Sequence, residues 1–463
     1  MATKAQSMRI SNWRLAITAI LGLWCLGTTA VSAAAPTLPE NAAEIHLGVA
    51  SCAGSTCHGA VVPWQGSNVL QNEHVTWKEK DAHSRAYKVL LDPRGVRIAR
   101  NLGLADAASA PECLSCHSDN VAADKRGKQF QLSDGVGCEA CHGGSVRWLG
   151  MHASGVSSHA QNVENGLYPT EDPQARAAMC LTCHVGDSTH VINHRIMGAG
   201  HPRLRFELDT FTWAQPAHFR IDDDYRKRKT VVDGMKTWAI GQVMALQLTV
   251  DGIADAKRGR DGAFPELVWF DCQACHHVVP PSGDDNWSND LRWHKRTGTG
   301  LGPGVPRLND ANFIMLRVAL GRIDQGLANT LREQTLALHS ASRQGPDALA
   351  KAAETLKGTT TRAITAINGY GFGKADVAAL IQALVAEGRS GELIDFGAAE
   401  QTTMALSALL AASKDATWLN EAQFVAMNTA LSQCYDAVQA DRNFSSETFL
   451  TALNGFAAAV PQF

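Results

Sequence analysis

Cysteine and histidine recur at one fixed spacing in four short segments of this sequence. The segments are CLSCH at 113–117, CEACH at 138–142, CLTCH at 180–184 and CQACH at 272–276. At the spacing C-x-x-C-H, two thiols can add to the two vinyl groups of a porphyrin, and the adjacent histidine can ligate the iron. The predicted thioether cysteines are Cys113, Cys116, Cys138, Cys141, Cys180, Cys183, Cys272 and Cys275. The predicted iron ligands are His117, His142, His184 and His276.

Paired cysteines also form zinc sites and disulfides. A zinc site made from C-x-x-C pairs does not need a histidine directly after every second cysteine. A disulfide across two intervening residues closes a tight ring and leaves the histidines unexplained. Covalently bound haem c is therefore the favoured interpretation of the four segments.

A fifth segment, CAGSTCH at 52–58, ends in the same Cys-His pair but has a four-residue spacer. Its small spacer residues allow a bulge that brings Cys52 back to the second vinyl group, with Cys57 and His58 in the usual arrangement. The sequence therefore predicts a fifth haem held by Cys52, Cys57 and His58. The alternative is a disulfide between Cys52 and Cys57 beside an unrelated histidine.

Each haem iron has a second axial position, whose occupant decides between electron transfer and ligand chemistry. Seventeen histidines leave a dozen for this role after the five motif histidines. We expect His83, His152, His194 and His201 to serve as second ligands. His74, His159, His190, His218, His277 and His294 remain open as ligands or as surface and packing residues, and the sequence does not assign a ligand to a particular haem.

The N-terminus has the layout of a secretory signal peptide. Lys4, Arg9 and Arg14 precede an apolar run and the small residues SAAAP, which predicts a signal at 1–34 and a periplasmic protein. Lipidation at Cys25 and an uncleaved membrane anchor are weaker alternatives. The net charge of −3 gives no indication of nucleic-acid binding.

Composition divides the rest of the chain. Residues 45–300 hold ten of the twelve cysteines and are predicted to form a multihaem domain of short helices and long loops, with one longer helix near 233–257. Residues 301–310 are a predicted linker. Apolar stripes at helical spacing, one of them from Phe313 to Leu331, predict a bundle of four to six helices over 311–463, in which Cys434 is a core residue. The expected fold class is mainly α.

The four regular motifs, together with GVGCEACHGG, TWKEKDAHSRAY and GHPRLRFEL, resemble the cytochrome c-554 group of multihaem cytochromes over about residues 45–310. This resemblance implies closely packed haems, mostly with two histidine ligands, and a relay of electrons from a periplasmic oxidoreductase toward quinone-linked or other cytochromes. The motif at Cys52 and the long C-terminal region depart from the tetrahaem pattern.

The expected function is electron transfer between redox partner proteins through about five haems. A reductase of small nitrogen or sulfur compounds with one open haem is the main alternative, and a haem-bearing subunit of a larger assembly is another. An oligomer could form through the helical bundle, and membrane association is expected only if the signal stays uncleaved.

Overall fold

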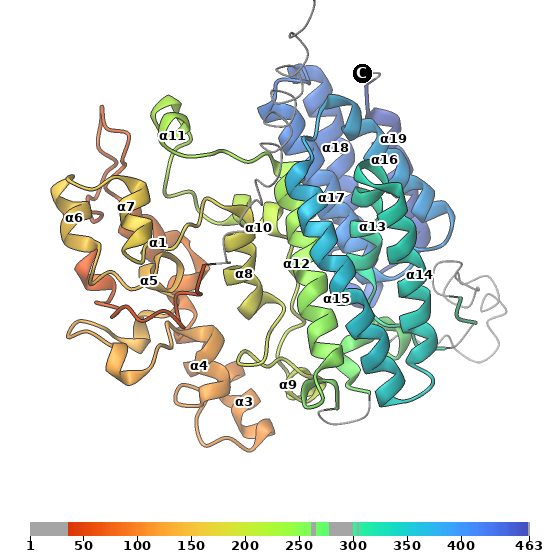
Figure 1. Cartoon of the computed structure of the whole chain (residues 1–463), viewed down its shortest axis with the longest axis horizontal. Coiled ribbons are helices and arrows are strands. Elements are labelled where there is room, and N and C mark those ends of the chain that lie inside the picture. Colours follow the sequence, from red (N-terminus) through yellow and green to blue (C-terminus); the bar gives the residue numbers. More distant parts are fainter. Residues whose placement is uncertain (1–35, 261–264, 277–299, 303–304, 462–463) are drawn as a thin grey trace, which may run out of the picture. The chain divides into compact units, whose positions relative to one another are not determined.

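Helices dominate the structure, a computed structural model that describes residues 36–260, 265–276, 300–302 and 305–461. The only β-type pairings among these residues are two isolated bridges, between His46 and Arg126 and between Phe270 and Leu308. The expected mainly α fold is therefore confirmed (Figure 1). The predicted signal at 1–34 lies outside the described residues. Within the described part of the chain, no helix has the length and apolar character needed to span a membrane.

The N-terminal half is built from short helices joined by loops. In chain order they are α1 (Glu73–Lys80), α2 (Lys88–Leu91), α3 (Pro93–Leu102), α4 (Pro111–His117), α5 (Cys138–His142), α6 (Leu149–Ser154), α7 (His159–Glu164), α8 (Pro173–His184), α9 (His194–Gly198), α10 (Leu208–Ala214) and α11 (Asp223–Arg228). Proline begins α3, α4 and α8, where its missing N–H costs no hydrogen bond. Three of these helices, α4, α5 and α8, end at the histidine of a C-x-x-C-H motif.

One long helix, α12 (Gly234–Ala254), confirms the helix predicted near 233–257. Asp233 caps it by accepting from the Lys236 amide, and Asp255 ends it. Most of its circumference is buried, because α12 packs on α8 and α10 and also on α13, α15 and α17. It is thus a core helix that both halves of the chain share (Figure 1).

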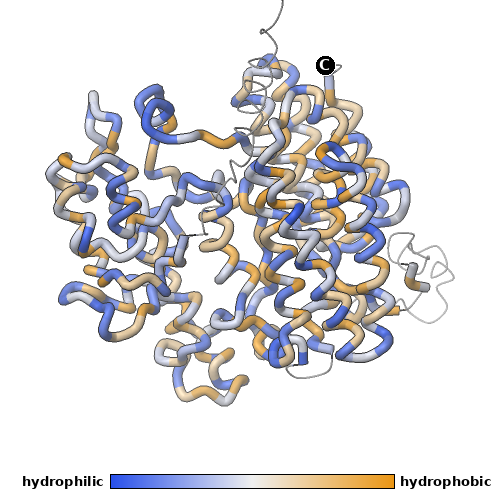
Figure 2. The backbone as a smooth tube through the Cα atoms, in the orientation of Figure 1, coloured by the Kyte–Doolittle hydropathy of each residue, from blue (hydrophilic) through white to orange (hydrophobic). Residues whose placement is uncertain are grey.

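The C-terminal region forms a bundle of seven helices in the described residues, more than the four to six predicted. They are α13 (Ala311–Ile323), α14 (Gln325–Ala341), α15 (Pro346–Gly369), α16 (Lys374–Arg389), α17 (Phe396–Asp415), α18 (Glu421–Ala437) and α19 (Ser446–Ala459). Their apolar residues alternate with polar ones along each helix (Figure 2). Cys434 is fully buried, as predicted for a core residue.

The single apolar stripe from Phe313 to Leu331 is divided between two helices, which corrects the prediction of one helix there. Asp324 takes an extended conformation between α13 and α14, and its carboxylate accepts from the Leu327 amide at 2.9 Å. An N-cap satisfies an otherwise unpaired helix-start N–H, so one aspartate is enough to start a new helix without glycine or proline.

The apolar core continues across the predicted linker at 301–310. Leu308 and Ala311 belong to the same buried cluster as Leu181 and Trp238, and Arg203 pairs with Glu400 of α17 at 2.7 Å. The domain boundaries at 45–300 and 311–463 stay a prediction.

Candidate haem-binding sites

Every motif histidine has another histidine opposite it. We number the motifs first to fifth by their histidines, His58, His117, His142, His184 and His276. The pairs, with the distances between ring centroids, are His58 with His152 at 6.1 Å, His117 with His201 at 6.3 Å, His142 with His218 at 6.3 Å, His184 with His83 at 6.2 Å and His276 with His194 at 6.2 Å.

The separation within each pair is the one that a shared metal ion requires. Two imidazoles that bind one ion from opposite sides, each at about 2 Å from nitrogen to metal, have ring centroids about 6 Å apart. Direct packing of the two rings does not explain this uniform separation. The centroid distance of two rings in van der Waals contact varies with their relative orientation, whereas the five pairs share nearly the same distance. The five pairs therefore fit the two axial positions of haem irons.

Hydrogen bonds at Nδ1 orient several of these rings. The Nδ1 atom of His58 contacts Glu73 at 2.9 Å, that of His83 contacts Asp81 at 2.9 Å, and that of His117 contacts the Ala86 carbonyl at 2.8 Å. A partner at Nδ1 fixes the tautomer and leaves Nε2 as the ligating atom. Burial lowers the pKa of His142 and of His184 to about 4, so both are neutral and can coordinate at pH 7.

Other histidines have different partners. The Nε2 atom of His159 contacts Glu171, and His46 and His190 each use both ring nitrogens within the protein. His74 lies against Trp77, and His339 is buried in the bundle. His277 and His294 lie outside the described residues.

The structure places all four predicted second ligands opposite a motif histidine. His152 faces His58 and not His142, which is its neighbour in the sequence. The fifth partner, His218, follows α10 in a loop that has no periodic pattern, and it is one of the histidines for which the sequence predicts no definite role. The sequence points to a further ligand only through numbers: five motif histidines need five partners, and only four second ligands are predicted.

The helical prediction around His83 needs correction. The spacing of His83, Tyr87 and Leu90 predicts one face of a helix, but in the structure Asp81 ends α1 and starts a short 3₁₀ turn at Ala82–Arg85. The Asp81 carboxylate accepts from the His83 amide at 3.0 Å and also contacts its Nδ1. The same carboxylate thus breaks the helix and orients the ring.

The irregular motif CAGSTCH has the same backbone hydrogen bond, from its histidine to its first cysteine, as the regular fifth motif. In the fifth motif the His276 amide donates to the Cys272 carbonyl at 2.7 Å, and in the first motif the His58 amide donates to the Cys52 carbonyl at 3.2 Å. The two extra residues are absorbed by a turn in which the Cys57 amide donates to the Gly54 carbonyl at 2.8 Å. Both Cys52 and Cys57 are free thiols.

Thiols of different motifs lie close together. The thiol of Cys52 interacts with that of Cys138, and the thiol of Cys116 interacts with that of Cys183. Cys141 is near enough to Cys180 for their charges to interact. The first motif therefore adjoins the third, the third adjoins the fourth, and the fourth adjoins the second, while the segment 194–201 carries the partner histidines of both the fifth and the second.

Buried polar contacts fix the first motif against the third. The Glu139 carboxylate accepts from the amides of Leu47 at 2.8 Å, Gly48 at 2.7 Å and Ser145 at 2.8 Å. The Gly-Gly pair after His142 passes close to backbone, since a Cβ atom on Gly144 would lie 2.8 Å from the Glu44 carbonyl carbon.

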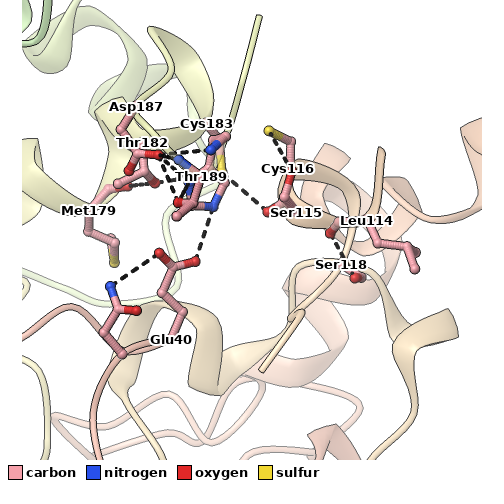
Figure 3. A network of polar contacts seen from close by, with 12 residues as sticks. Glu40, Leu114, Ser115, Cys116, Ser118, Met179, Thr182, Cys183, Asp187 and Thr189 are labelled. Carbon is pink, nitrogen blue, oxygen red and sulfur yellow. Dashed lines mark hydrogen bonds and ion pairs between the residues drawn. The ribbon is translucent and has the colours of Figure 1, made fainter. Parts of the chain in front are cut away.

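A charged cluster lies beside the thiols of the second and fourth motifs, where Figure 3 shows Glu40 and Asp187 near Cys183 and Cys116. His190 contacts Asp187 through Nδ1 at 2.9 Å and Glu40 through Nε2 at 3.0 Å. Burial alone would lower the pKa of His190, but the two carboxylates raise it to about 10. One ligand atom from each of the three groups lies within 4.8 Å of the others, and each ring nitrogen of the buried His190 contacts one of the two carboxylates, so the three groups form an ion pair network.

Residues 51–143 match the family model described as cytochrome c554 and c-prime. The resemblance expected over 45–310 is thus matched over a shorter stretch, which holds the first three motifs. No curated protein and no solved structure was found to match the chain.

Proposed function

We propose that this protein is a periplasmic pentahaem cytochrome that transfers electrons between redox partner proteins. The family match over 51–143 implies covalently bound haem c and multihaem electron transfer. When bound, each haem supplies an iron that exchanges one electron. The ten cysteines Cys52, Cys57, Cys113, Cys116, Cys138, Cys141, Cys180, Cys183, Cys272 and Cys275 would hold the five porphyrins.

The observation that carries this proposal is the set of five histidine pairs. Each motif histidine has a second imidazole at the separation of an axial partner. Two strong protein ligands let an iron change charge without exchanging a ligand, which suits electron transfer. The thiol contacts support a relay in the order first, third, fourth and second motif. The segment 194–201 supports the fifth motif as the next member, because it carries the partner histidines of the second and the fifth motif.

The main alternative, a reductase of small nitrogen or sulfur compounds, requires an iron with an open position. The histidine pairs disfavour it, because each of the five motif histidines faces a second histidine. The histidine pairs do not bear on the third alternative, a haem-bearing subunit of a larger assembly. Measurement of the oligomeric state tests that alternative.

Location and partners complete the proposal. The N-terminal layout supports export, and haem c attachment fits an exported protein. The partners we propose are a periplasmic oxidoreductase as donor and a quinone-linked or other cytochrome as acceptor, with association through the helical bundle as a further proposal.

Electron paramagnetic resonance of the oxidised holoprotein tests the proposal. We expect only low-spin ferric signals, of two kinds, because the imidazole planes are near parallel in two pairs, at 11° and 24°, and near perpendicular in the other three, at 79° to 86°. Crossed imidazole planes leave two iron orbitals close in energy and give the more anisotropic signal. A high-spin signal that responds to nitrite, hydroxylamine or nitric oxide would favour the reductase. A holoprotein mass that corresponds to fewer than five haems would refute the count.

A further inference from the structure

A carboxylate is the Nδ1 partner of a paired histidine at two of the five motifs. The Glu73 carboxylate lies 2.9 Å from Nδ1 of His58, in the first motif. The Asp81 carboxylate lies 2.9 Å from Nδ1 of His83, which faces the fourth motif. A carboxyl group is ordinarily ionised at pH 7, so each of these two rings has an anionic partner.

Both rings of the pair at the second motif have a neutral partner instead. Nδ1 of His117 donates to the Ala86 carbonyl at 2.8 Å, and Nδ1 of His201 donates to the Pro202 carbonyl at 2.8 Å. Because Nδ1 carries a single N–H, each carbonyl occupies the place that a carboxylate has at the other two motifs. The three pairs therefore differ in the charge of the partner at nearly the same distance.

One short helix, α1, carries both carboxylates. Glu73 is its first residue, and Asp81 directly follows its last. In the middle of the helix, the Trp77 indole donates to the Val136 carbonyl at 3.1 Å, which fixes α1 to the segment just before the third motif. The two carboxylates are therefore held by one anchored helix and not by two separate loops.

Further contacts fix each carboxylate. Gln71 has a left-handed backbone with φ of 60°, which is uncommon outside glycine, and its amide donates to Oε1 of Glu73 at 3.2 Å. Asp81 accepts from the His83 amide at 3.0 Å and from the Gln215 side chain at 2.9 Å. The side chains of Glu73 and Asp81 are 16% and 6% exposed, so water screens their charges only in part.

A carboxylate at Nδ1 favours the oxidised state of a bound iron. Ferric iron withdraws electron density from the imidazole, and an anion stabilises the resulting positive charge more than a carbonyl does, since a charge-assisted hydrogen bond is about twice as strong as a neutral one. This difference corresponds to a change of roughly five- to tenfold in the equilibrium between the two oxidation states. Hydrogen bonds around the axial ligands are one of the means by which a protein sets a haem potential.

We propose that Glu73 and Asp81 lower the reduction potentials of the haems at the first and fourth motifs, so that electrons pass from these motifs toward the second. The last two are neighbours, because Sγ of Cys183 in the fourth motif lies 4.0 Å from the Ser115 carbonyl oxygen in the second (Figure 3). One electron leaves the iron at the fourth motif, which becomes ferric, and the iron at the second becomes ferrous, with no bond formed or broken. The proposal rests on the proposed function, because it needs haems at these motifs, and it gives the relay a direction.

Redox titration of the holoprotein, followed by electron paramagnetic resonance, tests the proposal on Asp81→Asn, Glu73→Gln and the parent protein. Asparagine keeps an oxygen for the His83 amide and ring and removes the charge, and glutamine removes the charge of Glu73 at nearly equal size. The imidazole planes are near parallel at the first and fifth motifs and crossed at the other three, so the two variants are read in different signals.

We expect one third of the crossed-plane intensity to be reduced at a higher potential in Asp81→Asn, and half of the near-parallel intensity in Glu73→Gln. At the midpoint potential of the affected haem in the parent protein, the ratio of reduced to oxidised haem should rise roughly five- to tenfold. Both signals should stay low-spin, because the axial ligands remain. An unchanged potential in either variant would overturn the role of that carboxylate.

Glu171→Gln is the matched control for Glu73→Gln. Glu171 is also 16% exposed and also contacts a histidine, but that histidine, His159, faces no motif histidine. The near-parallel signal should therefore titrate in this variant as in the parent protein. An equal shift in the control would refute the specific effect of Glu73.

The parent protein distinguishes failure of this inference from failure of the cytochrome function. A high-spin signal or fewer than five haems would contradict the function, whereas five low-spin haems with unshifted variants contradict the direction alone. If neither variant accumulates, the crossed-plane signal of the parent protein decides, because it includes the haems of both the second and the fourth motif. Its reduction in a single step would refute the proposed difference, and reduction in two or more steps supports it.

Discussion

Replacing His218 by alanine tests the ligand pairs most directly, because this residue was assigned by geometry alone. His218 faces His142 at 6.3 Å, and its ring packs edge to face on Phe219 at 5.8 Å. It lies in a loop and outside the buried core cluster, so its removal should not disturb the helical packing. The substitution should therefore open one iron and leave the other four unchanged.

The expected magnitude follows from the number of pairs. One of five irons should convert, so about one fifth of the low-spin ferric intensity is lost and a high-spin signal of matching size appears. Added imidazole should restore the low-spin signal, because it fills the opened position without the covalent tether. Nitric oxide should bind one equivalent to the variant and none to the parent protein.

His159→Ala is the matched control, since His159 contacts Glu171 and faces no motif histidine. Its spectrum should equal that of the parent protein. If His218→Ala kept the full low-spin intensity, or if His159→Ala lost as much as His218→Ala, the assignment of ligands from centroid distances would be wrong.

Three further predictions concern attachment, pH and packing. Cys52→Ala should leave the first haem bound through one thioether, with one vinyl group unreacted, which the pyridine haemochrome spectrum detects, whereas a holoprotein mass with four haems before any mutation would favour the disulfide interpretation. Because the folded pKa of His190 is raised to about 10, its stabilising contribution is complete below its ordinary pKa near 6.5 and is lost as the pH rises toward 10. The melting temperature should therefore fall over that range in the parent protein, and a His190→Gln variant with the same decline would contradict this. Leu331→Ala should lower the free energy of unfolding by about 2 to 5 kcal/mol in urea denaturation followed by circular dichroism, against less than about 0.5 kcal/mol for the exposed Val425→Ala.

Local chemistry in the sequence was sufficient to predict the motif side of each site. The two thiols and the histidine of a C-x-x-C-H motif are neighbours in the chain, so their spacing alone states what they can bind. The structure also folds the spacer of CAGSTCH into a turn, in keeping with the small residues there.

The second histidine of each pair depends on contacts between residues that are far apart in the sequence. His152 was visible as a candidate, but its pairing with His58 depends on how α6 lies against the first motif, and nothing near His218 announces a ligand. The predicted helix boundaries were wrong for a similar reason. Asp324 caps a new helix inside the apolar pattern from Phe313 to Leu331, and Asp81 caps a short turn where the spacing of His83, Tyr87 and Leu90 predicts a helix. In both places the cap competes locally with a periodicity that extends over several turns.

The histidine pairs have a consequence for how this chain folds. The two members of each pair are about 75 to 100 residues apart, so every bound haem would close a large loop that flexible chain closes only at an entropic cost. In chain order, each loop begins before the preceding one ends, which makes the five loops a continuous series of overlapping cross-links. We therefore expect the N-terminal region to lose structure as a unit, and a missing haem to weaken segments far from its own cysteines.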